Sequence, residues 1–283
     1  MKLAVLGKGG SGKSSVSWLL IKELLAQRQL VLAIDADHNM DLMANLQVES
    51  EPGQNVVDAD EDFRELVGLT PQAGYKTLAA RDYEMLPKFS FTDDFTTKYA
   101  TSVEARLRVM NGGLGEDEVL FGTKCAHAYL SPLKYYLPLL ELNENETVVI
   151  DSVAGIDMVN FGLYAGIDAL VVVVNNHPHS LRVLSQILRA NETIKTKVFV
   201  VINKHDETKD AESVEQIKAK YGDLLLAVIP KDAGVYELDY TRVQEATKAQ
   251  VRQVLQKLPE PLVNQTAWSR VQALDLLKLE KTV

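Results

Sequence analysis

A glycine-rich loop with two lysines lies close to the N-terminus, and its spacing fits phosphate binding. The stretch GKGGSGKS, residues 7–14, matches G-x-x-x-x-G-K-[ST] directly after the apolar run 2–6. Glycines allow successive backbone N–H groups to face phosphate oxygens, and the helix that should start here adds its positive end. Lys13 offers a charge to the terminal phosphates, and the Ser14 hydroxyl is a Mg²⁺ ligand. The residues expected to hold the nucleotide are Gly9, Gly10, Ser11, Gly12, Lys13, Ser14 and Ser15.

Short apolar runs alternate along the chain with segments of helical length. The runs cover residues 2–6, 30–35, 147–151, 169–174, 197–203 and 224–229. None of them alternates strictly between polar and apolar residues, which is typical of parallel strands covered on both faces. Because helical segments such as 12–29 and 179–192 separate the runs, their order predicts βαβ crossovers. We therefore predict an α/β fold with a doubly wound, mostly parallel sheet and helices on both faces, as in P-loop NTPases.

Between residues 36 and 146 the pattern is different. The stretch 49–65 is strongly acidic, and residues 111–118 combine glycines with acids. This composition indicates a solvated insertion, although a region that moves with ligand or docks a partner remains an alternative. Because the run 147–151 must return to the same sheet, we predict a single domain over residues 1–283 with a switch or dimerisation insertion at about 50–146.

Composition argues against several classes of protein. The formal net charge of −9 gives no basic surface, so we expect no nucleic acid partner. The single cysteine, Cys125, cannot form an intrachain disulfide, which favours a cytoplasmic location. The apolar runs are too short for stable membrane insertion. The C-terminal stretch 266–283 carries mixed charges, so we expect it to dock as a helix on the protein's own core rather than on lipid. Its apolar face consists of Trp268, Val271, Leu274 and Leu277.

The first lysine of the loop, Lys8, is not required by a plain phosphate loop and alone would suit a solvated position. The string GKGGSGKSS, however, resembles the deviant Walker A motif of the superfamily of MinD, ParA and the nitrogenase iron protein. That resemblance implies an ATPase that forms a homodimer with nucleotide at the interface, where Lys8 reaches the partner subunit's nucleotide. It also implies that Lys8, Lys13 and Asp37 are catalytic, with Asp37 orienting the attacking water. Ser14, Asp35 and Asp151 would then lie around Mg²⁺.

Two stretches near the C-terminal half suggest how the base is held. Asn203 follows an apolar run and can both donate to and accept from adenine. The stretch 228–235 resembles the superfamily's adenine-framing segment, with Pro230, Lys231 and Asp232 nearest the base. Residues 203–206 also fit N-K-x-D, a guanine-binding pattern, so guanine stays open. We expect ATP and ADP, because the rest of the chain resembles the ATPase branch.

A closer resemblance lies in the middle of the chain. Residues 86–99, 107–113, 122–137 and 149–162 look like successive blocks of the CooC-type ATPases. Those proteins assist nickel insertion into carbon monoxide dehydrogenase and related enzymes, so the resemblance implies a client metalloenzyme. The alternatives are a positioning or partitioning ATPase of the MinD and ParA kind, and a CooC-like paralogue that has lost its metal.

One departure concerns the metal ligands that the CooC resemblance implies. That family has C-x-C before a helix, whereas here Thr123 stands in place of the first cysteine and only Cys125 remains. A hydroxyl is a poor ligand for Ni²⁺ or Zn²⁺. Cys125 and His127 from two subunits could form a Cys₂His₂ set at the dimer interface, or Cys125 could be a buried free thiol. His177 and His179 raise the same question, but their position before a helix favours loop and cap roles.

Overall fold

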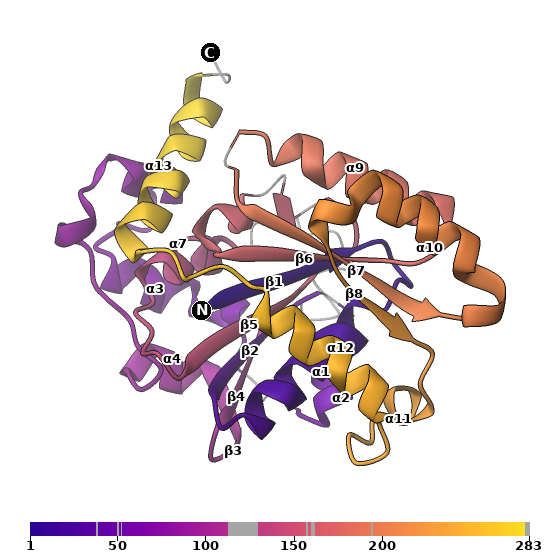
Figure 1. The fold of residues 1–283 in the computed structure, drawn as a ribbon. Helices are drawn as coiled ribbons and strands as arrows, with labels where there is room; N and C mark the ends of the chain where they lie inside the picture. The colour runs from indigo at the N-terminus through magenta and orange to yellow at the C-terminus, as the bar shows by residue number, and fades with distance from the viewer. Residues whose placement is uncertain are drawn as a thin grey trace.

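The computed structural model describes residues 1–280, except residues 38, 50, 52, 113–129, 157, 160, 161 and 194. Within these residues, eight strands form one sheet in the order β3-β4-β2-β5-β1-β6-β7-β8 (Figure 1). Every neighbouring pair is parallel except β3 with β4. The predicted doubly wound, mostly parallel α/β sheet is therefore confirmed. The strands are β1 (Lys2–Gly7), β2 (Leu30–Ala36), β3 (Ala100–Glu104), β4 (Leu107–Asn111), β5 (Glu146–Ser152), β6 (Ala169–Val174), β7 (Lys197–His205) and β8 (Leu225–Pro230).

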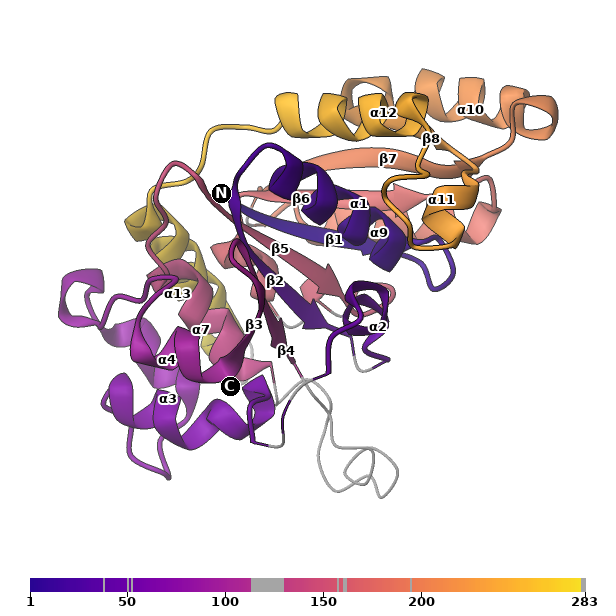
Figure 2. The same ribbon diagram turned by 90° about the horizontal axis from the view of Figure 1, so that it is seen from below.

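Helices cover both faces of the sheet (Figure 2), because each central strand is apolar on both sides. In β1, Leu6 belongs to one hydrophobic core and Val5 to the other. The helices on the Val5 face are α1 (Lys13–Ala26), α2 (Asp41–Leu46) and α12 (Glu245–Gln256). Those that pack on the Leu6 face are α3 (Asp60–Leu66), α4 (Asp94–Tyr99), α7 (Ser131–Leu139), α9 (Pro178–Ala190), α10 (Glu207–Tyr221) and α13 (Asn264–Glu280). The short helices are α11 (Ala233–Tyr236), η1 (Val56–Ala59), η2 (Tyr75–Ala80), η3 (Tyr83–Met85), η4 (Leu163–Gly166) and η5 (Gly222–Leu224).

The region 50–146 is more closely built into the fold than its composition indicates. Its strand β4 pairs in parallel with β2, and β3 adds an antiparallel edge. The acidic stretch folds into α3, whose Phe63 is fully buried between the rings of Phe89 and Phe95. Phe95 in turn packs on Tyr136 of α7. The insertion therefore extends the sheet and carries an aromatic core of its own, while its acids remain on the outside.

The C-terminal helix α13 docks on the protein's own core, as expected from its apolar face. Trp268, Val271 and Leu274 are buried, whereas Leu277 is 37% exposed. Figure 1 shows α13 running beside α7 at one end of the molecule. No helix in the described part of the chain combines the length and apolarity that a bilayer crossing requires.

A buried ion pair joins these two helices. Lys134 of α7 pairs with Asp275 of α13, and their side chains are 5% and 0% exposed. The Tyr135 hydroxyl donates to the second carboxylate oxygen of Asp275 at 2.6 Å. Burial lowers the pKa of Lys134, which shows that the loss of water outweighs the attraction of its partner. Such a pair positions helices more than it stabilises them.

We expect Asp275→Ala to destabilise the protein by about 3–5 kcal/mol, because it leaves the Lys134 charge buried without a partner. The matched double variant Lys134→Gln with Asp275→Asn replaces the ions by neutral amides and keeps an acceptor for Tyr135. It should recover most of that loss in urea unfolding. Equal destabilisation of the two variants would show that packing, not the unpaired charge, sets the cost.

Candidate nucleotide site

The phosphate loop connects β1 to α1 and depends on a glycine at its last position. Gly12 precedes α1 with a left-handed φ of +90°. A Cβ atom there would lie 2.3 Å from Nδ2 of Asn203, so any other residue would displace the Asn203 amide from the loop. The Asn203 amide donates to the Ser11 carbonyl at 3.0 Å and is 5% exposed. Asn203, which the sequence predicts to bind the base, therefore also holds the phosphate loop in place through a hydrogen bond.

A second residue of β7 contacts the same loop. The Lys204 ammonium donates to the Gly10 carbonyl at 3.1 Å. Lys204 itself has a φ of +60°, a conformation that is costly for a residue with a side chain. Because the Ser11 carbonyl faces Asn203, the N–H of the same peptide unit, that of Gly12, points the opposite way and can face a phosphate. The N-K-x-D pattern included Lys204 only as part of a guanine motif, and the supporting role of this lysine was missed.

Three carboxylates and one ammonium lie together at the carboxyl edge of the sheet. Asp35 and Asp151 end the adjacent strands β2 and β5 in direct register, and both are 0% exposed. The Lys13 ammonium lies 3.9 Å from a carboxylate oxygen of Asp37, which is also buried. Both Asp35 oxygens accept backbone N–H groups, from Asp37 at 3.1 Å and from Met43 at 2.9 Å. Asp35 thereby shapes the loop that carries Asp37.

Burial changes the protonation of this group. It raises the pKa of Asp35 to about 7, and the nearby carboxylate of Asp151 adds to the shift. Burial likewise raises the pKa of Asp151 to about 6, with a contribution from Asp37. The three carboxylates of this group carry more negative charge than the Lys13 ammonium balances. A bound cation would lower the free-energy cost of burying them in the ionised form.

The residues present fit a Mg²⁺ ion bound partly through water. One oxygen of Asp151 accepts from the Ser17 hydroxyl at 3.0 Å, while its other oxygen, Oδ2, is buried and has no hydrogen-bond partner among the described residues. A buried carboxylate oxygen without a donor is costly, and a metal-bound water would supply the missing donor. Ser14 stands on the first turn of α1, and its hydroxyl contributes to keeping Asp151 ionised.

The loops around the phosphate loop are joined to it by backbone hydrogen bonds. The N–H of Gly155, after β5, donates to the Gly7 carbonyl at 2.9 Å. The N–H of Gly112, after β4, donates to the Asp35 carbonyl at 2.6 Å. Leu130 approaches Gly112 closely, so the chain leaves the sheet after β4 and returns to α7 at one place. A shift of Asp35 would therefore be passed to Gly112 and to Leu130, the residues that precede and follow the segment 113–129.

The residues expected around the base have firm structural roles. Asp206 caps α10, accepts from the Thr208 hydroxyl at 2.7 Å and pairs with Lys231 at 3.0 Å. The hydrogen bonds from Thr208 and Lys231 lower the pKa of Asp206 to about 2. Asp232 caps α11 and accepts from Gly234 N–H and from the Thr247 hydroxyl. Pro230 ends β8 beside these caps.

The remaining predicted residues are Lys8, Ser15 and the expected ligands of a transition metal. Lys8 is half-buried, and its ammonium donates to the carbonyl of Gly9 in its own loop at 3.1 Å. Ser15 lies in the first turn of α1. Cys125, His127 and the neighbouring Thr123 lie outside the described residues.

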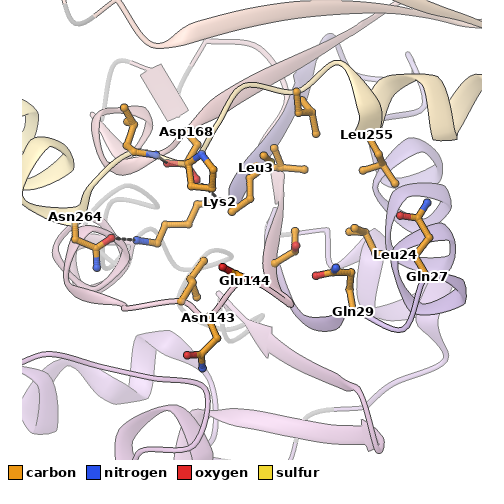
Figure 3. Close-up of a pocket in the computed structure, with 16 residues that line it drawn as sticks. Lys2, Leu3, Leu24, Gln27, Gln29, Asn143, Glu144, Asp168, Leu255 and Asn264 are labelled. Atoms are coloured by element: carbon orange, nitrogen blue, oxygen red, sulfur yellow. Dashed lines mark hydrogen bonds between the residues drawn. The ribbon is translucent and has the colours of Figure 1, made fainter.

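A separate cavity of about 410 Å³ lies at the opposite, amino edge of the sheet (Figure 3). Lys2 and Asn264 form one end of it, with the Lys2 ammonium donating to Asn264 at 2.8 Å. Burial lowers the pKa of Lys2 to about 8. None of the predicted site residues lines this cavity. The described residues that the sequence predicts to act in catalysis and nucleotide binding lie at the carboxyl edge of the sheet instead.

Comparison with known proteins agrees with this geometry. A family model described as the CobQ/CobB/MinD/ParA nucleotide binding domain matches residues 3–244, which hold the whole site and end before α12 and α13. An uncharacterized ATP-binding protein of Methanocaldococcus jannaschii is 29% identical over 236 residues, 82% of this chain and 88% of that protein. The carbon monoxide dehydrogenase accessory protein CooC of Rhodospirillum rubrum is 26% identical over 242 residues, 84% of this chain and 87% of that protein.

Among solved structures, the MinC:MinD cell division protein complex of Aquifex aeolicus matches with a TM-score of 0.60 at 15% identity. The match covers 92% of this chain and 97% of that chain. The ParA family ATPase of Chlorobium tepidum matches with a TM-score of 0.61 at 17% identity, over 90% of this chain and 98% of that chain. These two likenesses support the fold.

The raised pKa of Asp151 predicts a pH dependence of stability in the absence of nucleotide and Mg²⁺. The native carboxyl group binds its proton more tightly than the unfolded one, so its contribution is complete below the unfolded pKa. That contribution is lost as the pH rises through about 6. Asp151→Asn should therefore be more stable than the wild type at pH 7, by about 2–3 kcal/mol, and equally stable near pH 4.

Urea unfolding at pH 4, 5.5 and 7 measures the difference between the two proteins. Asp223→Asn, at an exposed position before β8, is the control and should follow the wild type. A difference between Asp151→Asn and wild type that does not change with pH would contradict the assignment.

Proposed function

Because the chain belongs to the CobQ/CobB/MinD/ParA nucleotide-binding family, we propose that it is a Mg²⁺-dependent ATPase that closes into a homodimer around its nucleotide. The observation that carries the proposal is the buried group of Lys13, Asp37 and Asp151 behind a phosphate loop that contains a second lysine, Lys8. ATP-binding relatives over most of the chain support the nucleotide. Turnover would drive opening and closing of the dimer rather than convert a small molecule.

In the proposed reaction each residue acts through its position. The loop N–H groups and Lys13 bind the phosphates, while Asp37 lies close enough to Lys13 to hold a water beside the terminal phosphate. A bound Mg²⁺ supplies charge neutralisation, and Ser14 and Asp151 are the residues to hold it, with Asp35 behind them. Lys8 lies on the less buried side of the loop, where it can leave the Gly9 carbonyl and reach a partner subunit's nucleotide.

The contacts of Asp206 favour adenine over guanine. In N-K-x-D proteins the aspartate must present free oxygens to the guanine N–H groups. Here those oxygens already accept from Thr208 and Lys231. Asn203 keeps its side-chain oxygen available while its amide nitrogen holds the loop. ATP and ADP are therefore the nucleotides we propose, with Pro230, Lys231 and Asp232 framing the base.

For the client we propose a metalloenzyme that receives a metal ion, most reasonably nickel. The support is the similarity to CooC of Rhodospirillum rubrum, a carbon monoxide dehydrogenase accessory protein. Cys125 and His127 would contribute Ni²⁺ or Zn²⁺ ligands at the dimer interface, with Thr123 as the departure from C-x-C. The chain around them begins and ends beside Asp35, so nucleotide exchange can act on it. A positioning ATPase, or a paralogue without metal, is the alternative that the MinD and ParA likenesses leave.

The Lys8 proposal predicts that ATP hydrolysis depends on encounters between subunits. The wild-type rate per molecule should rise with protein concentration and reach a plateau. Lys8→Ala should lower the plateau by about 10²-fold or more, because a cation that stabilises the transferred charge is lost. Lys218→Ala, on the exposed side of α10, is the matched loss of one lysine and should leave the rate unchanged. A concentration-independent rate that survives Lys8→Ala would reject the proposal.

A further inference from the structure

Two histidines lie exposed and face to face where β6 leaves the sheet. His177 and His179 flank Pro178 at the start of α9. Their ring centres are 5.1 Å apart, and the ring planes differ by 20°. Two imidazoles that bind one ion at about 2.1 Å have ring centres roughly 5 Å apart. The observed spacing therefore suits a shared ion after rotation about the side-chain bonds.

The loop around the two histidines is held by its own hydrogen bonds. The Asn175 side chain accepts from His177 N–H at 3.3 Å, and Asn175 N–H donates to the Ser180 hydroxyl at 3.2 Å. Ser180 N–H donates to the His177 carbonyl at 2.8 Å. Ser180 is buried, whereas both imidazoles point to the outside. The loop thus presents the two rings from a fixed backbone, which lowers the ordering cost of binding.

The ring nitrogens are almost unused within the described chain. Nδ1 of His177 accepts a long hydrogen bond from His179 N–H at 3.3 Å, and the other three ring nitrogens have no partner there. Imidazole nitrogens suit a borderline divalent transition ion rather than Mg²⁺.

We propose that His177 and His179 bind a divalent transition ion, with Ni²⁺ as the cargo class, at a site separate from Cys125 and His127. The site rests on the proposed role in metal delivery. Among the described residues no group of three metal-ligating side chains exists, so each chain fills two positions and leaves others to water or an acceptor. Incomplete, exposed coordination suits an ion that must be passed on. When Nε2 of His177 takes the ion, Nδ1 carries the proton and the long cap bond to His179 is given up.

The position of the pair connects it to the nucleotide site. β6 lies beside β1, and Val173 is in register with Gly7, the first residue of the phosphate loop. The Val173 carbonyl approaches Gly7 so closely that a Cβ there would lie 2.4 Å from it. By contrast, β1, β5 and β2 separate β6 from β4, which leads into the segment with Cys125. Strand β6 therefore links the first residue of the phosphate loop to the loop that carries the histidines.

Calorimetric titration of the metal-free full-length protein with Ni²⁺ tests the site. The background is Cys125→Ala with His127→Ala, and the test variant adds His177→Asn with His179→Ala. Asparagine at 177 keeps an acceptor for the helix cap but is a poor nickel ligand. We expect the background protein to bind Ni²⁺ and the added changes to weaken that binding at least tenfold. Gln186→Ala, on the exposed face of α9, is the control and should bind like the background.

An affinity within twofold of the background after both histidines are replaced would overturn the proposal. If the background variant does not fold, the wild type and His177→Asn with His179→Ala are compared directly, and the Ni²⁺ bound per chain should fall. The two proposals fail separately. Loss of ATP-dependent dimerisation with histidine-dependent Ni²⁺ binding intact would remove the proposed function alone, and the reverse would remove this site alone.

Discussion

The structure depends on the burial of unbalanced charge at one end of an apolar sheet. Asp35, Asp37 and Asp151 lie within the protein beside a single ammonium, Lys13. Water cannot screen them there, so the raised pKa values of Asp35 and Asp151 record a cost that the fold carries without ligand. A divalent cation with a phosphate chain would meet both the acids and the lysine. A bound cation would therefore remove part of the cost of keeping these like charges together.

The surrounding contacts carry that effect outward. Asn203 and Lys204 hold the phosphate loop from β7, while Gly155 and Gly112 attach the chain after β5 and β4 to Gly7 and Asp35. On the far side of the chain that follows β4, the Lys134 and Asp275 pair fixes α7 against α13. Contacts from β7 thus hold the phosphate loop, and the ion pair with α13 holds α7.

Local signals explain which parts could be predicted from the sequence. The phosphate loop and the strands at the six apolar runs were predicted correctly. Buried parallel strands and phosphate loops are each encoded by a short contiguous stretch of sequence. Strands β3 and β4 were missed, because β3 is mostly exposed and the short run of β4 is interrupted by Arg108 and ends in Asn111. The support from Lys204 and the pairing of Asp206 with Lys231 were missed because both depend on residues that lie far apart in the chain. The Lys134 and Asp275 pair, separated by 141 positions, leaves no local pattern either.

The central claim is that ATP closes two copies of this chain into a dimer. Sedimentation velocity on the Asp37→Ala protein, which should bind but not hydrolyse ATP, tests it most directly. With Mg²⁺ and ATP we expect the mass of a dimer at micromolar concentration, and with ADP the mass of a monomer. Lys13→Ala should stay monomeric in both. A single mass that is indifferent to the nucleotide and to Lys13 would contradict the account.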